Sequence, residues 1–118
     1  MLVADIHHVS INIEDLPRSL AFYSDTLGLR TLPRPTLAVD GAWLDAGGGR
    51  QVHLIVAPVP PDQGQHFAFL VDDMDATVGA LTEAGVKVRG PFQIPDSEAR
   101  QAFFFDPDGN RLEINQPY

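Results

Sequence analysis

The chain has 118 residues, of which 44% are hydrophobic and 20% are charged. This length predicts one domain that can bury a core of its own. The formal net charge is −8, and the lysines and arginines form no run. Nucleic acids and anionic membrane surfaces attract clustered positive charge, so the composition argues against both as partners.

The sequence contains no cysteine, so any metal site must use histidine and carboxylate side chains. The N-terminal segment lacks the basic start and long apolar run of a signal peptide. No apolar stretch approaches the ~18 residues that a membrane-spanning helix needs. We therefore expect the protein in the cytoplasm.

The first predicted element is a strand over residues 8–13. Apolar and polar side chains alternate along it, which is typical of a strand with one face toward the core. The polar face carries His8, Ser10 and Asn12.

A helix is predicted next. Asp15 is a suitable N-cap, Pro17 fits the first helical turn, and Gly28 is placed to end the helix in the left-handed conformation. Three extended segments follow, at about 29–35, 40–46 and 50–57. Residues 57–65 contain three prolines and a glycine and are predicted to be a linker.

The second half repeats this order of elements. We predict a strand at 66–71, a helix at about 75–84, and strands at about 86–91, 100–106 and 110–115. The fold class is therefore α+β. A single domain, 1–118, would consist of two βαβββ modules, 1–57 and 65–118, joined by the linker.

The two halves also align residue by residue. Residues 6–30 align with 65–87, and residues 41–55 align with 101–114. The pairs of the alignment that matter for function are His8 with His66, Asp15 with Asp73, Trp43 with Phe103, and His53 with Glu113.

Four of these positions are candidate metal ligands: His8, His53, His66 and Glu113. Each neighbours apolar residues on its own strand, so all four side chains are expected on the sheet face away from the helices. Three imidazoles and a carboxylate suit a divalent transition metal, and an octahedral ion would keep two adjacent positions for a bidentate substrate. A single histidine in a strand is more often merely hydrogen-bonded, so the prediction depends on the four positions being equivalent.

The sequence resembles the vicinal oxygen chelate superfamily, which includes glyoxalase I, fosfomycin-resistance thiol transferases, bleomycin resistance proteins and extradiol dioxygenases. The matching segments are HHVSINIEDLPRSLAFYSDTLGL, HFAFLVDDMDATVGALTEAGV and FFFDPDGNRLEI. The resemblance implies curved mixed sheets that form a cleft. It also implies a small-molecule substrate and a homodimer with sites at the interface.

The resemblance further implies that the four candidate ligands bind Ni, Zn, Mn, Co or Fe, as in glyoxalase I-like members. Three positions depart from the glyoxalase pattern. His53 stands where a glutamate is usual, and Asn12 and Ala57 stand where an arginine and an asparagine would hold glutathione. These departures argue against the usual glutathione substrate.

The reaction implied by the resemblance is proton transfer in a substrate that chelates the metal through two neighbouring oxygens, with Glu113 as the catalytic base. The candidate substrate contacts are Ser10, Asn12, Trp43, Phe104 and Arg100. For the aromatic residues a core position is the alternative, and for Arg100 it is an exposed position.

Three functions remain open at this point. The first is a metal-dependent lyase or isomerase, similar to lactoylglutathione lyase, that acts on a small oxo-compound or its thiol adduct. The second is a small Fe(II) dioxygenase that uses His8, His66 and Glu113. The third is a drug- or metabolite-binding resistance protein without turnover.

Overall fold

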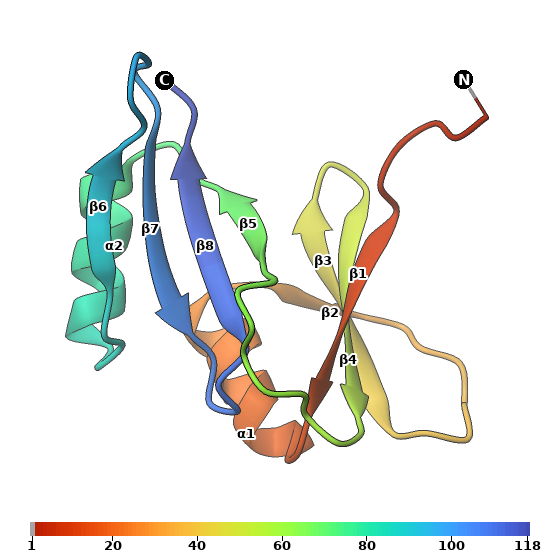
Figure 1. Cartoon of the computed structure of the whole chain (residues 1–118). Coiled ribbons are helices and arrows are strands. Elements are labelled where there is room, and N and C mark those ends of the chain that lie inside the picture. Colours follow the sequence, from red (N-terminus) through yellow and green to blue (C-terminus); the bar gives the residue numbers. More distant parts are fainter. Residues whose placement is uncertain (1) are drawn as a thin grey trace. The chain divides into compact units, whose positions relative to one another are not determined.

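A computed structural model describes residues 2–118 and divides the chain into two compact units, Met1–Pro60 and Pro61–Tyr118 (Figure 1). Unit 1 contains β1 (His8–Ile13), α1 (Leu16–Leu20), the π-helical segment η1 (Ala21–Thr26), β2 (Arg30–Leu32), β3 (Gly41–Gly47) and β4 (Arg50–Val56). Its four strands form one sheet in the order β1-β4-β3-β2. β1 runs parallel to β4, and the other two pairs are antiparallel.

Unit 2 has the same topology. It contains β5 (Phe67–Leu70), α2 (Met74–Glu83), β6 (Arg89–Gln93), β7 (Arg100–Phe105) and β8 (Arg111–Gln116). The sheet order is β5-β8-β7-β6, again with one parallel pair, β5 and β8. The predicted α+β fold of two βαβββ modules is confirmed.

Equivalent residues begin and end the two helices. The carboxylates of Asp15 and Asp73 each accept a hydrogen bond from the backbone N–H three residues further on, at 3.2 and 3.0 Å. This is the N-cap arrangement predicted for Asp15. Gly28 and Gly85 follow the helices with φ of +85° and +88°, which glycine adopts without strain.

Three elements differ from the sequence-based expectation. β2 covers only Arg30–Leu32 of the extended segment expected at about 29–35. After α1 the backbone widens into a π-helix, with the Leu27 N–H bonded to the Phe22 carbonyl at 2.9 Å. β6 begins at Arg89 rather than at 86, because the Val86 N–H still bonds the Leu81 carbonyl of α2 at 2.9 Å. Val86 therefore belongs to the capping motif that ends the helix.

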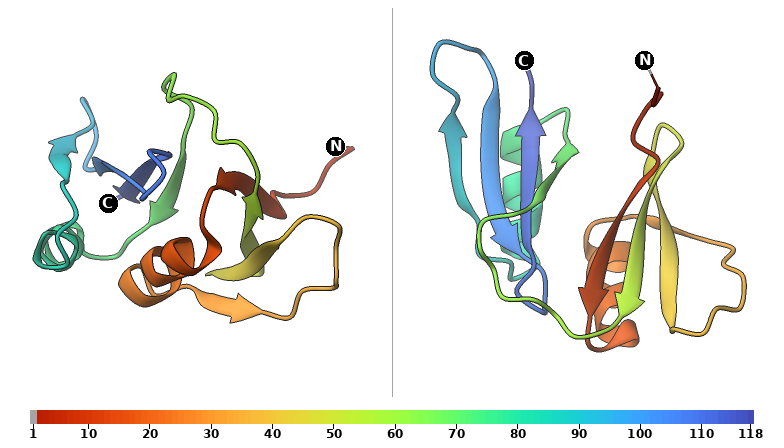
Figure 2. Two further views of the ribbon diagram at one scale, coloured as in Figure 1. Left: turned by 90° about the horizontal axis from the view of Figure 1, so that it is seen from below. Right: turned by 45° about the vertical axis from the view of Figure 1, so that its right-hand side comes forward.

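The core of each unit lies on one face of its sheet. Figure 2 shows α2 lying along one face of the β5–β8 sheet, and α2 contacts β6, β7 and β8. The core strand residues of the two units are equivalent in the repeat: Ala42 and Ala102, Leu44 and Phe104, Val52 and Leu112, Leu54 and Ile114. The opposite face of each sheet is therefore left for polar side chains. Within residues 2–118, no helix is long and apolar enough to cross a membrane.

The close approach of β3 to β4 at Gly41 predicts a stability effect. A Cβ added there would collide with the Leu54 carbonyl oxygen, whereas a Cβ at Gly79, in the exposed middle of α2, would meet nothing within 4 Å. We expect Gly41→Ala to lower the free energy of unfolding by on the order of 2–3 kcal/mol. Gly79→Ala should raise it by about 0.5–1 kcal/mol, because alanine favours the helix. Urea unfolding monitored by circular dichroism tests both, and equal effects of the two variants would contradict the close approach.

Candidate metal centre

In each of the inner strands β4 and β8, one polar residue lies between two buried apolar neighbours. His53 lies between the buried Val52 and Leu54, and Glu113 lies between the buried Leu112 and Ile114. Because neighbours in a strand point to opposite faces, His53 and Glu113 lie on the face away from the core. Each is itself only 8–9% exposed, since side chains of adjacent strands cover it.

In unit 1, His53 is the middle ring of a three-ring stack. The His8 ring lies 4.0 Å from it at an interplanar angle of 14°, and the Trp43 ring lies 4.6 Å from it at 9°. β4 runs between β1 and β3, so the two rings approach His53 from opposite sides. The His53 Nε2 is also 2.8 Å from the Gln51 side-chain oxygen.

The surroundings of His53 favour a neutral imidazole. Burial lowers the pKa of His53, and the nearby positive charges of His8, His7 and Arg34 lower it further. A metal ion binds the neutral ring, so this environment removes the competition from protons.

In unit 2, His66 and Glu113 form a direct pair. The His66 Nε2 is 2.9 Å from the Glu113 Oε1, and the Asn115 side-chain amide donates to the Glu113 Oε2 at 3.1 Å. The second ring nitrogen of His66, Nδ1, is 2.8 Å from the Gly64 carbonyl oxygen. With Nδ1–H bonded to this carbonyl, Nε2 is the nitrogen that faces Glu113: it donates to the carboxylate when protonated, and its lone pair could bind a metal once that proton is lost.

The pKa of His66 shifts in the opposite direction to that of His53. The Gly64 carbonyl and the Glu113 carboxylate raise the pKa of His66, because both accept hydrogen bonds from the protonated ring. A metal ion that binds between His66 and Glu113 would have to displace this shared proton.

The spacing of the unit 2 pair fits two neighbouring ligands of one ion. Ligands bound at about 2.1 Å and at right angles lie ~3.0 Å apart. The His66 Nε2 and the Glu113 Oε1 are 2.9 Å apart. Within residues 2–118, no group of three or more His, Cys, Asp or Glu side chains could hold a metal ion. The four candidate ligands occur as two pairs, one in each unit.

The chain is also similar to known proteins. A family model, the Glyoxalase/Bleomycin resistance protein/Dioxygenase superfamily, matches residues 5–114. The chain belongs to this superfamily. The resemblance found in the sequence is therefore confirmed.

Two curated relatives and one solved structure illustrate the similarity. The uncharacterized protein YaeR of Escherichia coli is 33% identical over 120 residues, covering 92% of this chain and 93% of YaeR. Glyoxylase I 4 of Arabidopsis thaliana is 32% identical over 123 residues, covering 95% of this chain and 70% of that protein. The structure of a glyoxalase family protein from Bacillus anthracis has a TM-score of 0.89 at 26% identity, covering 100% of this chain and 98% of that one.

Other proteins similar to this chain have different descriptions. Glutathione transferase FosA of Serratia marcescens is 28% identical, covering 97% of this chain and 82% of FosA. The structure of TnmS3 from Streptomyces, described as an antibiotic binding protein, has a TM-score of 0.79 at 29% identity. The match covers 100% of this chain and 99% of TnmS3. The proteins similar to this chain thus include one described as an enzyme and one described as a binding protein.

The predicted substrate contacts of this superfamily member lie on different faces of the sheets. Ser10 pairs with His53 across β1 and β4 and is exposed. Trp43 stacks on His53. The Asn12 side-chain amide donates to the Pro58 carbonyl at 2.8 Å and so anchors the start of the linker.

Phe104 and Arg100 lie on the helix side of their sheet and do not support the substrate contacts predicted for them. Phe104 is 1% exposed and occupies the core. Arg100 donates two hydrogen bonds to the Asp75 carboxylate of α2, at 2.9 and 3.2 Å. The physical reason is the strand alternation, which points both residues away from Glu113.

The aromatic residue beside Glu113 is Phe103, which was not among the predicted site residues. It pairs with Glu113 across β7 and β8, and its ring contacts the His66 ring edge-on at 5.5 Å. The internal repeat contains the signal that identifies it, because Phe103 aligns with Trp43 and Phe104 aligns with the core residue Leu44.

The two histidines should titrate in opposite directions in metal-free protein. We expect NMR of the imidazole carbons to give a pKa for His66 above, and for His53 below, the ordinary value of about 6.5. Glu113→Gln should lower the pKa of His66 toward that value and leave His53 unchanged. The pKa of His66 is raised in the folded state, so the His66–Glu113 pair stabilises the fold fully below about pH 6.5. This stabilisation is lost as the pH rises through the raised pKa. A His66 that titrates below His53 would contradict the hydrogen bonds described.

Proposed function

We propose that this superfamily member is a divalent-metal-dependent enzyme of glyoxalase type, which catalyses proton transfer in a small oxo-compound or its thiol adduct. The observation that supports it most strongly is the His66–Glu113 pair, with two donor atoms at 2.9 Å on the free face of the sheet. The His8–His53 pair occupies the equivalent place in unit 1.

The proposed centre combines the two pairs into one set of four ligands, His8, His53, His66 and Glu113. One unit alone provides only two, so the centre requires a unit 1 and a unit 2, from one chain or from two chains of a homodimer. Bound there, Ni, Zn, Mn, Co or Fe would act as a Lewis acid toward two neighbouring substrate oxygens.

The residues around the centre have distinct roles in the proposed reaction. Glu113 would be the base: a carboxylate oxygen takes a proton from the hydroxyl-bearing carbon next to the carbonyl and returns it to the carbonyl carbon, while the hydroxyl proton passes to the former carbonyl oxygen. The reaction is then an isomerisation in which no atom is gained or lost. Asn115 holds the other carboxylate oxygen at 3.1 Å and so orients Glu113. Ser10, on the same face as His53, is a candidate contact for substrate or bound water.

His53 is a ligand rather than a base in this proposal. Its lowered pKa keeps a lone pair free at neutral pH, but a metal-bound ring has no lone pair left to accept a proton. Gln51, 2.8 Å from the His53 Nε2, is a candidate for orienting the ring.

A binding protein without turnover is the second candidate function. It is supported by the similarity to TnmS3, whose description names it an antibiotic binding protein. Full retention of four metal-competent side chains favours the enzyme, because binding a drug does not require them.

Metal content and turnover test the proposal together. Dialysis against Ni²⁺, Zn²⁺, Mn²⁺, Co²⁺ or Fe²⁺ should give one tightly bound ion per chain, measured by plasma mass spectrometry. His53→Ala and Glu113→Gln should each weaken metal binding by at least about tenfold. Glu113→Gln should also lower turnover of methylglyoxal–thiol adducts by about 100-fold or more.

The control is Asp75→Asn, which removes a carboxylate on the other face of unit 2 and should bind metal normally. Protein that binds none of the five metals would refute the enzyme proposal. Metal binding that His53→Ala and Glu113→Gln leave unchanged would refute the ligand assignment.

A further inference from the structure

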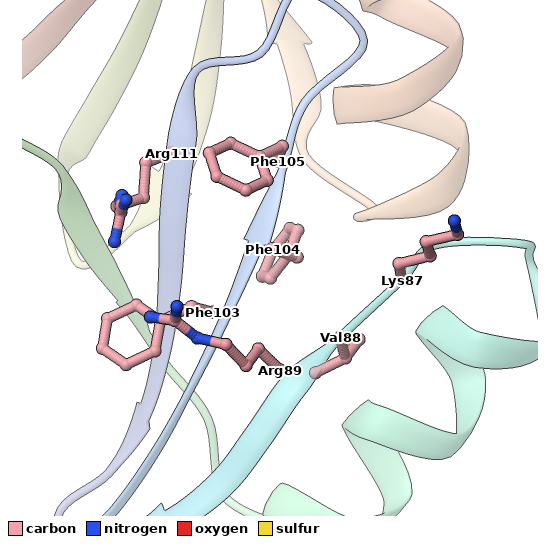
Figure 3. A pocket seen from close by; sticks show the side chains of 7 residues that line it. All are labelled: Lys87, Val88, Arg89, Phe103, Phe104, Phe105 and Arg111. Carbon is pink, nitrogen blue, oxygen red and sulfur yellow. The ribbon is translucent and has the colours of Figure 1, made fainter. Parts of the chain in front are cut away.

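Unit 2 contains a pocket that none of the roles above uses. It has a volume of about 310 Å³ and lies along β6 and β7 (Figure 3). Its lining includes three phenylalanines, Phe103, Phe104 and Phe105, and three cationic residues, Lys87, Arg89 and Arg111. The Phe104 side chain is buried in the core, so the rings open to a ligand are those of Phe103 and Phe105. Apolar walls with a few charged groups are typical of a site for a small molecule.

Two of the three cations are available to a ligand. Arg111 forms an ion pair with Asp62 at 2.8 Å, so its charge is largely compensated. Lys87 and Arg89 form no salt bridge with any residue of the described part of the chain. Two cations without a salt bridge in the lining of one pocket are unexpected in a chain with a net charge of −8.

The rings hold the guanidinium groups in place. The Arg89 guanidinium carbon lies 5.5 Å from the centre of the Phe103 ring, and the Arg111 carbon lies 5.6 Å from that of Phe105. Figure 3 shows Arg89 extending across Phe103. A cation held over a ring can still bind an anion with its outer N–H groups.

Phe103 connects this pocket to the proposed metal centre. Its ring lines the pocket and contacts His66 at 5.5 Å, and its backbone pairs with Glu113. A molecule that reaches the His66–Glu113 pair can therefore place its remaining atoms against Phe103 and Arg89.

We propose that this pocket binds the part of the substrate remote from the reacting oxygens, and that this part consists of an apolar body with an anionic group, a carboxylate or a phosphonate. The inference rests on the proposed function for its link to turnover, but the pocket itself needs no metal. Arg89, which lies over Phe103, binds the anion, Lys87 adds positive charge to the pocket, and the rings of Phe103 and Phe105 contact the apolar body.

Binding of simple aryl compounds to metal-free protein tests the pocket. Phenylphosphonate and phenylacetate carry the anion, 2-phenylethanol is the neutral match, and 2-phenylethylamine is the cationic one. We expect at least one of the two anions to bind at least about tenfold more tightly than the alcohol, with amide shifts at residues 103–105 in NMR titrations. Binding of the anions should weaken as salt is added, and binding of the alcohol should not.

The double variant Lys87→Gln/Arg89→Gln should remove the preference for the anions, whereas Arg18→Gln, an exposed arginine of unit 1, should retain it. If the double variant fails to fold, Arg89→Gln alone and the salt dependence of the unaltered protein give the same test. Preference for only one anion would identify the anionic group as carboxylate or phosphonate.

The proposal is refuted if the alcohol or the amine binds as tightly as both anions, or if the shifts lie outside the pocket. Since these measurements use metal-free protein, failure of the metal proposal would appear separately, as absent metal binding. Anion preference without metal binding would leave the pocket as the site of a binding protein.

Discussion

The alternation of side chains in the inner strands β4 and β8 is the constraint on which the other features depend. Each strand points its apolar residues into a core that the neighbouring helix helps to close, so the residue between them must face the other way. In unit 1 that residue is His53, and in unit 2 it is Glu113. A shift of register by one residue would bury both polar groups in the core and expose the core residues on the site face.

The repeat gives the two units the same backbone but different electrostatics. In unit 1 two imidazoles and an indole stack, and burial favours a neutral His53. In unit 2 an imidazole contacts a carboxylate, and hydrogen bonds favour a protonated His66. In the proposed reaction unit 2 would handle protons and substrate charge, with Glu113 as the base, while unit 1 would provide His8 and His53 as ligands.

Much of the fold and part of the site follow from the sequence. Local sequence signals predict the N-cap at Asp15, the end of the first helix at Gly28 and the polar face of the strands. Local periodicity did not reveal that Val86 belongs to the capping motif after α2 rather than to β6, because that depends on one backbone hydrogen bond. The contact of His66 with Glu113, 47 residues apart, also depends on the parallel pairing of β5 with β8. The sequence names Phe104 and Arg100 as candidate substrate contacts, whereas the structure places Phe104 in the core and pairs Arg100 with Asp75. The alignment of Phe104 with the core residue Leu44 in the repeat is the signal for the core position.

The central claim is that His8, His53, His66 and Glu113 bind one ion. The most direct test is a crystal structure of the metal-loaded protein with anomalous diffraction data collected at the absorption edge of the metal. The account predicts a single strong peak per chain, with one donor atom of each of the four residues at about 2.0–2.3 Å. A peak bound by only one of the two pairs, with the other pair outside bonding distance in every assembly in the crystal, would contradict it.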